Sequence, residues 1–248
     1  MTQLAPQQAQ QQVLLHELNH RINNEFAAVI SVVSLTAARA DNDDVKAALS
    51  SVTELLHHHA AVHRALQMPE PDSLIDAAAY LRKLCVAISR SQLEPRKINL
   101  VLAPQPLRLE AERCWRIGLI VYELVINAAW HAFPRGDGEV RLELLRTGPF
   151  VECRVSDNGS SPPKIRPGHG LKIVDELARS LDGRFEQRLG PRGSRSIVTF
   201  PLEDTEAQAR QARIQALNAR TLRIEDYALI TSQANAIVRA KRTWVSMK

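Results

Sequence analysis

Hydrophobic side chains recur every three or four residues along the first part of the chain, a spacing typical of amphipathic helices. Residues 8–38 carry one such stripe, residues 45–66 carry a second, and a polar break at residues 39–44 separates them. The segment Met68-Pro69-Glu70-Pro71 ends the second stripe, because proline cannot continue a helix. The pattern therefore predicts a helical hairpin. One hairpin buries its stripe poorly, so we expect two copies to form a homodimeric four-helix bundle.

The rest of the chain alternates between helical and strand-like patterns. Helices are predicted at residues 73–91, 109–132 and 171–181. Strand-like runs occur at residues 98–102, 140–145, 151–156 and 196–200. This order predicts an α+β fold, with helices packed on one face of a sheet. We expect three parts, namely a helical hairpin at residues 8–70, an α/β-sandwich domain at residues 71–203 and a basic helical extension at residues 204–248.

The net charge of +5 is concentrated near the end of the chain. Residues 204–248 contain eight Arg or Lys against four Asp or Glu, a net charge of +4, so the other residues carry about +1. The main body is therefore not a basic surface of the kind that binds nucleic acid. The extension has only Tyr227 and Trp244 as aromatic residues, which also disfavours nucleic-acid binding.

The cysteine pattern and the hydropathy indicate a cytoplasmic protein without a membrane span. Cys85, Cys114 and Cys153 form no CxxC pair, which disfavours a zinc site or a disulfide framework. The longest uncharged segment of the N-terminal half, residues 26–38, has 13 residues and is too short to cross a bilayer. The Gln-rich N-terminus lacks the basic start and apolar run of a secretion signal.

His20 is the first residue that could carry chemistry. It lies on the polar face of the first predicted helix, and helical spacing places Glu17 and Asn24 on the same face. A neutral imidazole can accept a phosphoryl group near neutral pH, and a neighbouring carboxylate such as Glu17 can orient it or accept its proton. The same pattern also fits an ordinary surface histidine.

A second candidate site lies on the predicted helix at residues 109–132. Glu123, Asn127 and His131 are each four residues apart and therefore form one line on that helix. A carboxylate and an amide one turn apart can hold a hydrated Mg²⁺ and polarise a reacting group, and His131 can meet a phosphate oxygen. The alternative is an amphipathic core helix with a polar edge.

Two loops complete the set of candidate residues. Asp157 and Gly159 directly follow a predicted strand, and an Asp at that position can accept a hydrogen bond from a ligand amino group such as adenine N6. Gly168 and Gly170 open the helix that begins near Leu171, where backbone N–H groups can approach an anion. Each motif is weak by itself, because Asp-Asn-Gly turns and single Gly-x-Gly pairs are common.

Taken in this order, the four motifs resemble the H, N, G1 and G2 boxes of sensor histidine kinases. The most similar subgroup is the HRxxN type, related to the HWE kinases, with a Bergerat-type (GHKL) ATP-binding domain. His20-Arg21 with Asn24 resembles its acceptor motif, and the segment from Gly118 to Pro134 resembles its N box. The resemblance covers roughly Leu14 to Pro201.

The resemblance implies a two-component phosphorelay protein, an ATP-dependent transferase that phosphorylates itself on His20. Asn127 would coordinate Mg²⁺, Asp157 would bind adenine, Glu123 would assist transfer, and the three glycines would shape the nucleotide pocket. The phosphoryl group would then pass to an Asp on the receiver domain of a response regulator. The implied cofactors are ATP and Mg²⁺.

The sequence departs from the family pattern at several positions. Trp130 occupies the place of a phosphate-contacting Lys, Ser161 replaces a glycine, Asn23 replaces a common Lys, and the Trp-x-Glu element of HWE kinases is missing. Trp130 and Ser161 motivate an alternative, a degenerate kinase that serves as a non-catalytic phosphotransfer protein, a regulator-binding scaffold or a phosphatase. A kinase that acts on Ser of a partner would share the ATP-binding fold but would not need the histidine hairpin.

Overall fold

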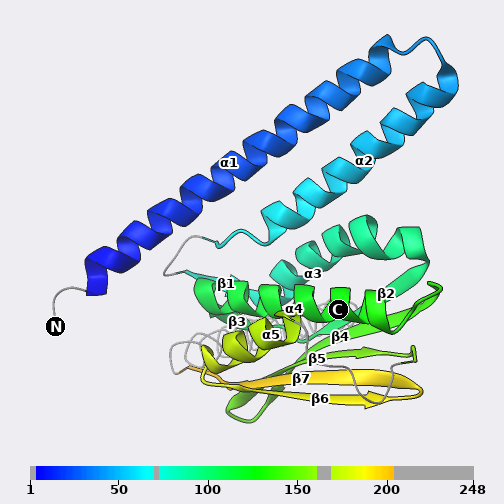
Figure 1. The fold of residues 1–248 in the computed structure, drawn as a ribbon. Coiled ribbons are helices and arrows are strands. Elements are labelled where there is room, and N and C mark those ends of the chain that lie inside the picture. Colours follow the sequence, from blue (N-terminus) through cyan, green and yellow to red (C-terminus); the bar gives the residue numbers. More distant parts are fainter. Residues whose placement is uncertain (1–3, 70–72, 161–168, 204–248) are drawn as a thin grey trace, which may run out of the picture. The chain divides into compact units, whose positions relative to one another are not determined.

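The computed structural model describes residues 4–69, 73–160 and 169–203. Ser161, Gly168 and the predicted extension at residues 204–248 lie outside the described residues. The predicted hairpin is present as α1 (Leu4–Arg39) and α2 (Asp43–Ala65), shown in Figure 1. Asn42 caps α2, because its side-chain oxygen accepts hydrogen bonds from Asp44 N at 2.8 Å and Val45 N at 3.3 Å. Among the described helices, none is long and apolar enough to span a membrane.

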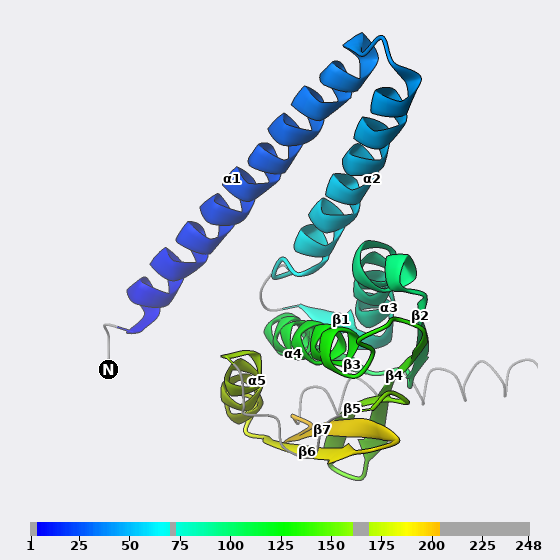
Figure 2. The same ribbon diagram turned by 45° about the vertical axis from the view of Figure 1, so that its right-hand side comes forward.

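The second half of the chain forms a five-stranded sheet with the strand order β2-β4-β5-β7-β6. Its strands are β2 (Ile98–Pro104), β4 (Gly138–Thr147), β5 (Phe150–Asp157), β6 (Arg184–Gly190) and β7 (Gly193–Pro201). β2 and β4 are parallel, and every other neighbouring pair is antiparallel. Three helices pack on one face of this sheet, as Figures 1 and 2 show: α3 (Ala77–Ile88), α4 (Ala111–His131) and α5 (His169–Arg179). The predicted α+β fold is confirmed.

Two elements differ from the sequence prediction. The helix predicted from residue 73 begins only at Ala77, because β1 (Leu74–Asp76) first pairs with β3 (Arg108–Glu110) in a separate two-stranded sheet. Asp76 then caps α3 by accepting a hydrogen bond from Ala79 N at 3.1 Å. The edge strand β6 was missed, since its alternating polar residues resemble a loop when no partner strand is known. A π-helical turn, η1 (Ser89–Leu93), and a 3-10 turn, η2 (Glu94–Arg96), join α3 to β2.

The core lies between the three helices and the sheet. The inward positions of β4 show the period of two that a half-buried strand requires, because Val140, Leu142 and Leu144 are buried while their neighbours are not. The last turn of α2 also joins this core through Val62 and Ala65, and Trp115 of α4 donates a hydrogen bond from Nε1 to the Leu66 carbonyl at 2.8 Å. This packing fixes α4, and with it the line of polar residues that the sequence predicted.

Candidate functional site

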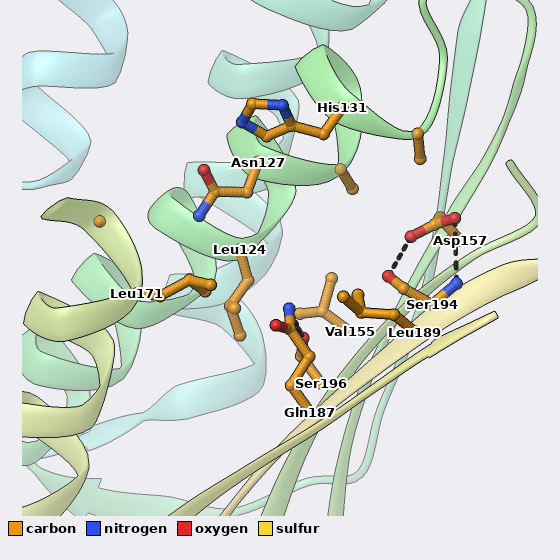
Figure 3. Close-up of a pocket in the computed structure, with 13 residues that line it drawn as sticks. Leu124, Asn127, His131, Val155, Asp157, Leu171, Gln187, Leu189, Ser194 and Ser196 are labelled. Carbon is orange, nitrogen blue, oxygen red and sulfur yellow. Dashed lines mark hydrogen bonds between the residues drawn. The ribbon is translucent and has the colours of Figure 1, made fainter. Parts of the chain in front are cut away.

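A cavity of about 150 Å³ opens between α4, the first turn of α5 and the strands β5, β7 and β6 (Figure 3). Five of the predicted site residues line it: Asn127, His131, Asp157, Gly170 and Leu171. The other lining residues are Leu124, Ala128, Ala132, Val155, Gln187, Leu189, Ser194 and Ser196. Pockets for drug-sized ligands are roughly 300–1,000 Å³. This cavity therefore suits one planar ring system, and the rest of a larger ligand would extend beyond it.

Asp157 is the last residue of β5, and the protein holds its carboxylate from two sides. One oxygen, Oδ1, accepts hydrogen bonds from Gly159 N at 3.0 Å and from Ser194 N at 3.2 Å. The other oxygen, Oδ2, accepts a hydrogen bond from Ser194 Oγ, and Figure 3 shows the two side chains facing each other. A carboxylate held in this way has one defined orientation and can still accept a further hydrogen bond from a ligand in the cavity.

Gly159 allows the chain after β5 to lie close to the end of α4. A Cβ at this residue would lie 2.3 Å from the carbonyl oxygen of Ala132, which no side chain could tolerate. The same carbonyl accepts a hydrogen bond from Ser160 N at 3.1 Å. Asn158 anchors the turn from the other side, because its Oδ1 accepts a hydrogen bond from Glu139 N at 2.8 Å. The predicted Asp-Asn-Gly turn thus closes the cavity against the end of α4.

The polar line on α4 meets the first turn of α5. A Cβ on Gly170 would lie 2.6 Å from Glu123 Oε2 and 3.4 Å from Asn127 Nδ2, so α5 approaches the polar line closely, and a larger residue here would require the Glu123 side chain to move. Asn127 Nδ2 is buried and has no hydrogen-bond partner among the described residues. A buried polar atom without a partner is unusual in a native protein, and an amide N–H group of this kind can donate to an acceptor atom of a ligand. Glu123 contacts this region but does not line the cavity.

His20 lies on α1 and does not line the cavity. Its side chain is exposed, and its Nδ1 lies 3.1 Å from Asn24 Nδ2, one helical turn away. The predicted neighbour Glu17 instead accepts a hydrogen bond from Arg21 Nε at 3.2 Å. The ring thus contacts the Asn24 carboxamide through Nδ1, whereas Nε2 does not face Asn24.

Two family models match the sequence in succession. A family described as histidine kinase matches residues 17–92, and one described as histidine kinase-like ATPase domain matches residues 96–194. The chain belongs to the histidine kinase family. The first match contains His20 with its helical hairpin, and the second contains the cavity with Asn127 and Asp157. The resemblance that the sequence motifs indicated is confirmed.

The chain is similar to several curated histidine kinases. Blue-light-activated histidine kinase 1 of Erythrobacter litoralis is 25% identical over 202 residues, which are 77% of this chain and 53% of that protein. Sensor histidine kinase PdtaS of Mycobacterium tuberculosis is 27% identical over 202 residues, which are 76% of this chain and 39% of that protein. This chain thus spans about half or less of the length of these relatives.

A solved structure supports the fold of this histidine kinase chain. It is the histidine kinase domain of the blue-light activated histidine kinase EL346 from Erythrobacter litoralis. It matches 80% of this chain and 95% of its own, with a TM-score of 0.52 and 21% sequence identity. At this identity the comparison shows the shared fold.

Trp130 of this histidine kinase does not line the cavity. Its side chain is 59% exposed, and the guanidinium carbon of Arg96 lies 4.5 Å from the centroid of its rings. Arg96 also donates a hydrogen bond from Nη2 to the Phe133 carbonyl at 2.9 Å. Trp130 and Arg96 therefore form a cation–π pair beside the end of α4, a contact that the sequence did not predict.

Sequence reasoning missed the side of the cavity that β6 and β7 form. Ser194 holds Asp157 although the two residues are 37 positions apart. Gln187 of β6 donates a hydrogen bond to Ser196 Oγ of β7 at 3.1 Å and thereby fixes the floor of the cavity. The closely spaced Gly190 and Gly193 could have indicated a hairpin turn, but no local signal shows that the turn returns to Asp157.

Proposed function

We propose that this chain is the catalytic core of a two-component protein-histidine kinase, which transfers the γ-phosphoryl group of ATP to His20 and then to an Asp of a receiver domain. The observation that carries the proposal is the built cavity, in which an oriented Asp157 carboxylate lies across from the unpartnered Asn127 amide. The same chain carries an exposed histidine that contacts Asn24. The cavity can bind a nucleotide, and the exposed His20 can accept its phosphoryl group.

The residues of the cavity fit ATP and Mg²⁺. Asp157 would accept a hydrogen bond from the adenine amino group, while the apolar side chains of Leu124, Val155 and Leu171 would contact the ring. Asn127 would offer its side-chain oxygen to Mg²⁺, which in nucleotide sites is held by a few protein oxygens together with phosphates and water. The bound ion would neutralise charge that develops on the phosphates. His131, one helical turn after Asn127 on α4, would contact a phosphate oxygen.

His20 would act as the nucleophile through Nε2. In the structure the amide nitrogen Nδ2 of Asn24 lies 3.1 Å from Nδ1 and can donate to it. A turn of the carboxamide that presents its oxygen instead would keep the proton on Nδ1 and leave the lone pair on Nε2. Nε2 forms the new bond to phosphorus as the bond to the leaving phosphate oxygen breaks, and Asn24 stabilises the positive charge on the ring. Glu123, on α4, would assist the transfer. Glu17 would accept the ring proton after its carboxylate has separated from Arg21.

We further propose that the chain acts as a cytoplasmic homodimer in which residues 8–70 provide dimerisation and the phosphoacceptor, residues 71–203 bind ATP, and residues 204–248 form an extension. The hairpin leaves large apolar side chains in water, including Leu18, Val29 and Val32, which are 54%, 48% and 65% exposed. A second copy that covers this stripe would complete a four-helix bundle. The three cysteines are free and buried, in keeping with a reducing compartment.

Autophosphorylation with labelled ATP and Mg²⁺ tests the proposed reaction. We expect an acid-labile phosphate on the wild-type protein and none on His20→Gln. His57→Gln, which removes an exposed histidine of α2, is the matched control and should keep the label. Absence of label on the wild-type protein, or label that persists in His20→Gln, would overturn the proposed function.

A further inference from the structure

The face of the sheet that the three helices leave uncovered carries an unusual group of arginines at the β6–β7 hairpin. Gln187 and Ser196 point inward and line the nucleotide cavity. Because side chains alternate along a strand, the adjacent Arg188 and Arg195 point to the opposite face, and both are exposed. Arg192 lies in the turn between them. These three residues are called the arginine group below.

The arginines of β6 and β7 are cross-strand neighbours, and among the residues that it describes the structure shows no ion pair between them and an acid. Arg188 and Arg195 are direct partners in the register of the two strands, and like charges in this position are destabilising. Within residues 4–69, 73–160 and 169–203, no ion pair joins any member of the arginine group to a carboxylate.

Elsewhere the same face of the sheet pairs its arginines with acids. Arg141 contacts Glu139 at 3.0 Å, and Arg154 contacts Glu152. On β6 itself, Arg184 contacts Glu186 at 3.0 Å. The unpaired charge is therefore specific to the arginine group and is not a general property of the sheet surface.

The arginine group lines a hollow of about 540 Å³, together with backbone of Gly190 and Gly193. Two carboxylates also border the hollow, but each already has partners. Glu186 is paired with Arg184, and Asp157 accepts hydrogen bonds from Ser194 and Gly159. The hollow thus presents three guanidinium groups and two carboxylates, each of which already has partners.

We propose that the arginine-lined side of this hollow is a binding site for a small polyvalent phosphate anion, on the face of the sheet opposite the nucleotide cavity, with which the hollow shares Asp157, Leu189 and Ser194 at the strand ends. A guanidinium group offers a planar fork of donors that matches phosphate oxygens, and Arg188 and Arg195 both line the hollow from neighbouring strands. The bound anion would remove the repulsion between Arg188 and Arg195 and would join β6 to β7.

Calorimetric titration of inorganic pyrophosphate into the full chain, without Mg²⁺ and at constant low ionic strength, tests the proposal. We expect saturable binding at one site. Arg188→Gln and Arg195→Gln should each weaken it by about tenfold or more, because each removes a charged donor. Arg146→Gln is the matched control. Arg146 lies at the opposite end of the sheet, where it donates a hydrogen bond to the Gly148 carbonyl at 2.8 Å, and its removal should leave the affinity within twofold (about 0.4 kcal/mol).

A second control separates this site from the nucleotide cavity. Asn127→Ala should leave pyrophosphate binding unchanged, since Asn127 lies on the other face of the sheet. The proposal is wrong if no saturable binding occurs, if only Asn127→Ala weakens it, or if Arg146→Gln weakens it as much as Arg195→Gln. Binding of a polyglutamate peptide in place of pyrophosphate would also overturn it, in favour of an acidic protein partner. Because none of these outcomes depends on phosphorylation of His20, failure of the kinase reaction would leave the test intact.

Discussion

The hydroxyl group of Ser194 orients the Asp157 carboxylate of the nucleotide cavity, to which it donates a hydrogen bond from a strand that is distant in sequence. Ser194→Ala removes this donor and leaves Oδ2 without its protein partner. The other oxygen, Oδ1, keeps its hydrogen bonds from Gly159 N at 3.0 Å and Ser194 N at 3.2 Å. The carboxylate should therefore stay close to its position but lose its fixed orientation.

The magnitude follows from the contacts that remain. A hydrogen bond to a charged group contributes about 1.5–3 kcal/mol. Asp157 is only partly buried, so water can replace part of the lost contact, and the lower end of that range applies. We expect adenosine to bind about tenfold more weakly to Ser194→Ala, since about 1.4 kcal/mol corresponds to a factor of ten.

Calorimetric titration of adenosine into the wild type and the variant measures this effect without phosphoryl chemistry. Ser194→Thr retains a hydroxyl group and suits a β-strand, so it should bind within about threefold of the wild type. Ser180→Ala, which removes a hydroxyl group bonded only to the Leu177 carbonyl at 2.7 Å, should bind like the wild type. Equal affinities for Ser194→Ala and the wild type would refute the inference that Ser194 orients Asp157 for the ligand.

Three further results are expected. Gly170→Ala places a methyl group 2.6 Å from Glu123 Oε2, so it should displace the Glu123 side chain and weaken binding of Mg²⁺ with a non-hydrolysable ATP analogue by about threefold; unchanged affinity in the same titration would contradict the close approach. Asn42→Ala removes the cap of α2 and should destabilise the hairpin by about 1 kcal/mol in chemical unfolding, whereas Asn42→Ser should restore most of the loss. Burial, followed by the nearby charge of Arg64, lowers the pKa of His63; the unfolded chain therefore binds the proton first, so stability should fall as the pH drops below about 6.5. Thermal unfolding between about pH 5 and 8 should show a weaker fall in His63→Gln, and identical pH profiles would exclude this contribution.

The sequence by itself determined the features that depend on local spacing. Helical periodicity predicts α1 and α2, because a helix places residues three and four apart on one face whatever surrounds it. The same rule aligned Glu123, Asn127 and His131 on α4, and the turn chemistry of Asp157 and Gly159 placed a bend at the end of β5. The order of these motifs was sufficient to indicate the histidine kinase family.

Only the tertiary structure decided which distant residues complete each site. The contact of Ser194 with Asp157 and the pairing of Arg188 with Arg195 depend on the register of β5, β6 and β7, which long-range hydrogen bonds fix. The close approach of Gly170 to Glu123 appears only when α5 packs against α4. Strand pairing and helix packing join residues far apart in the chain, so no local pattern in the sequence contains them.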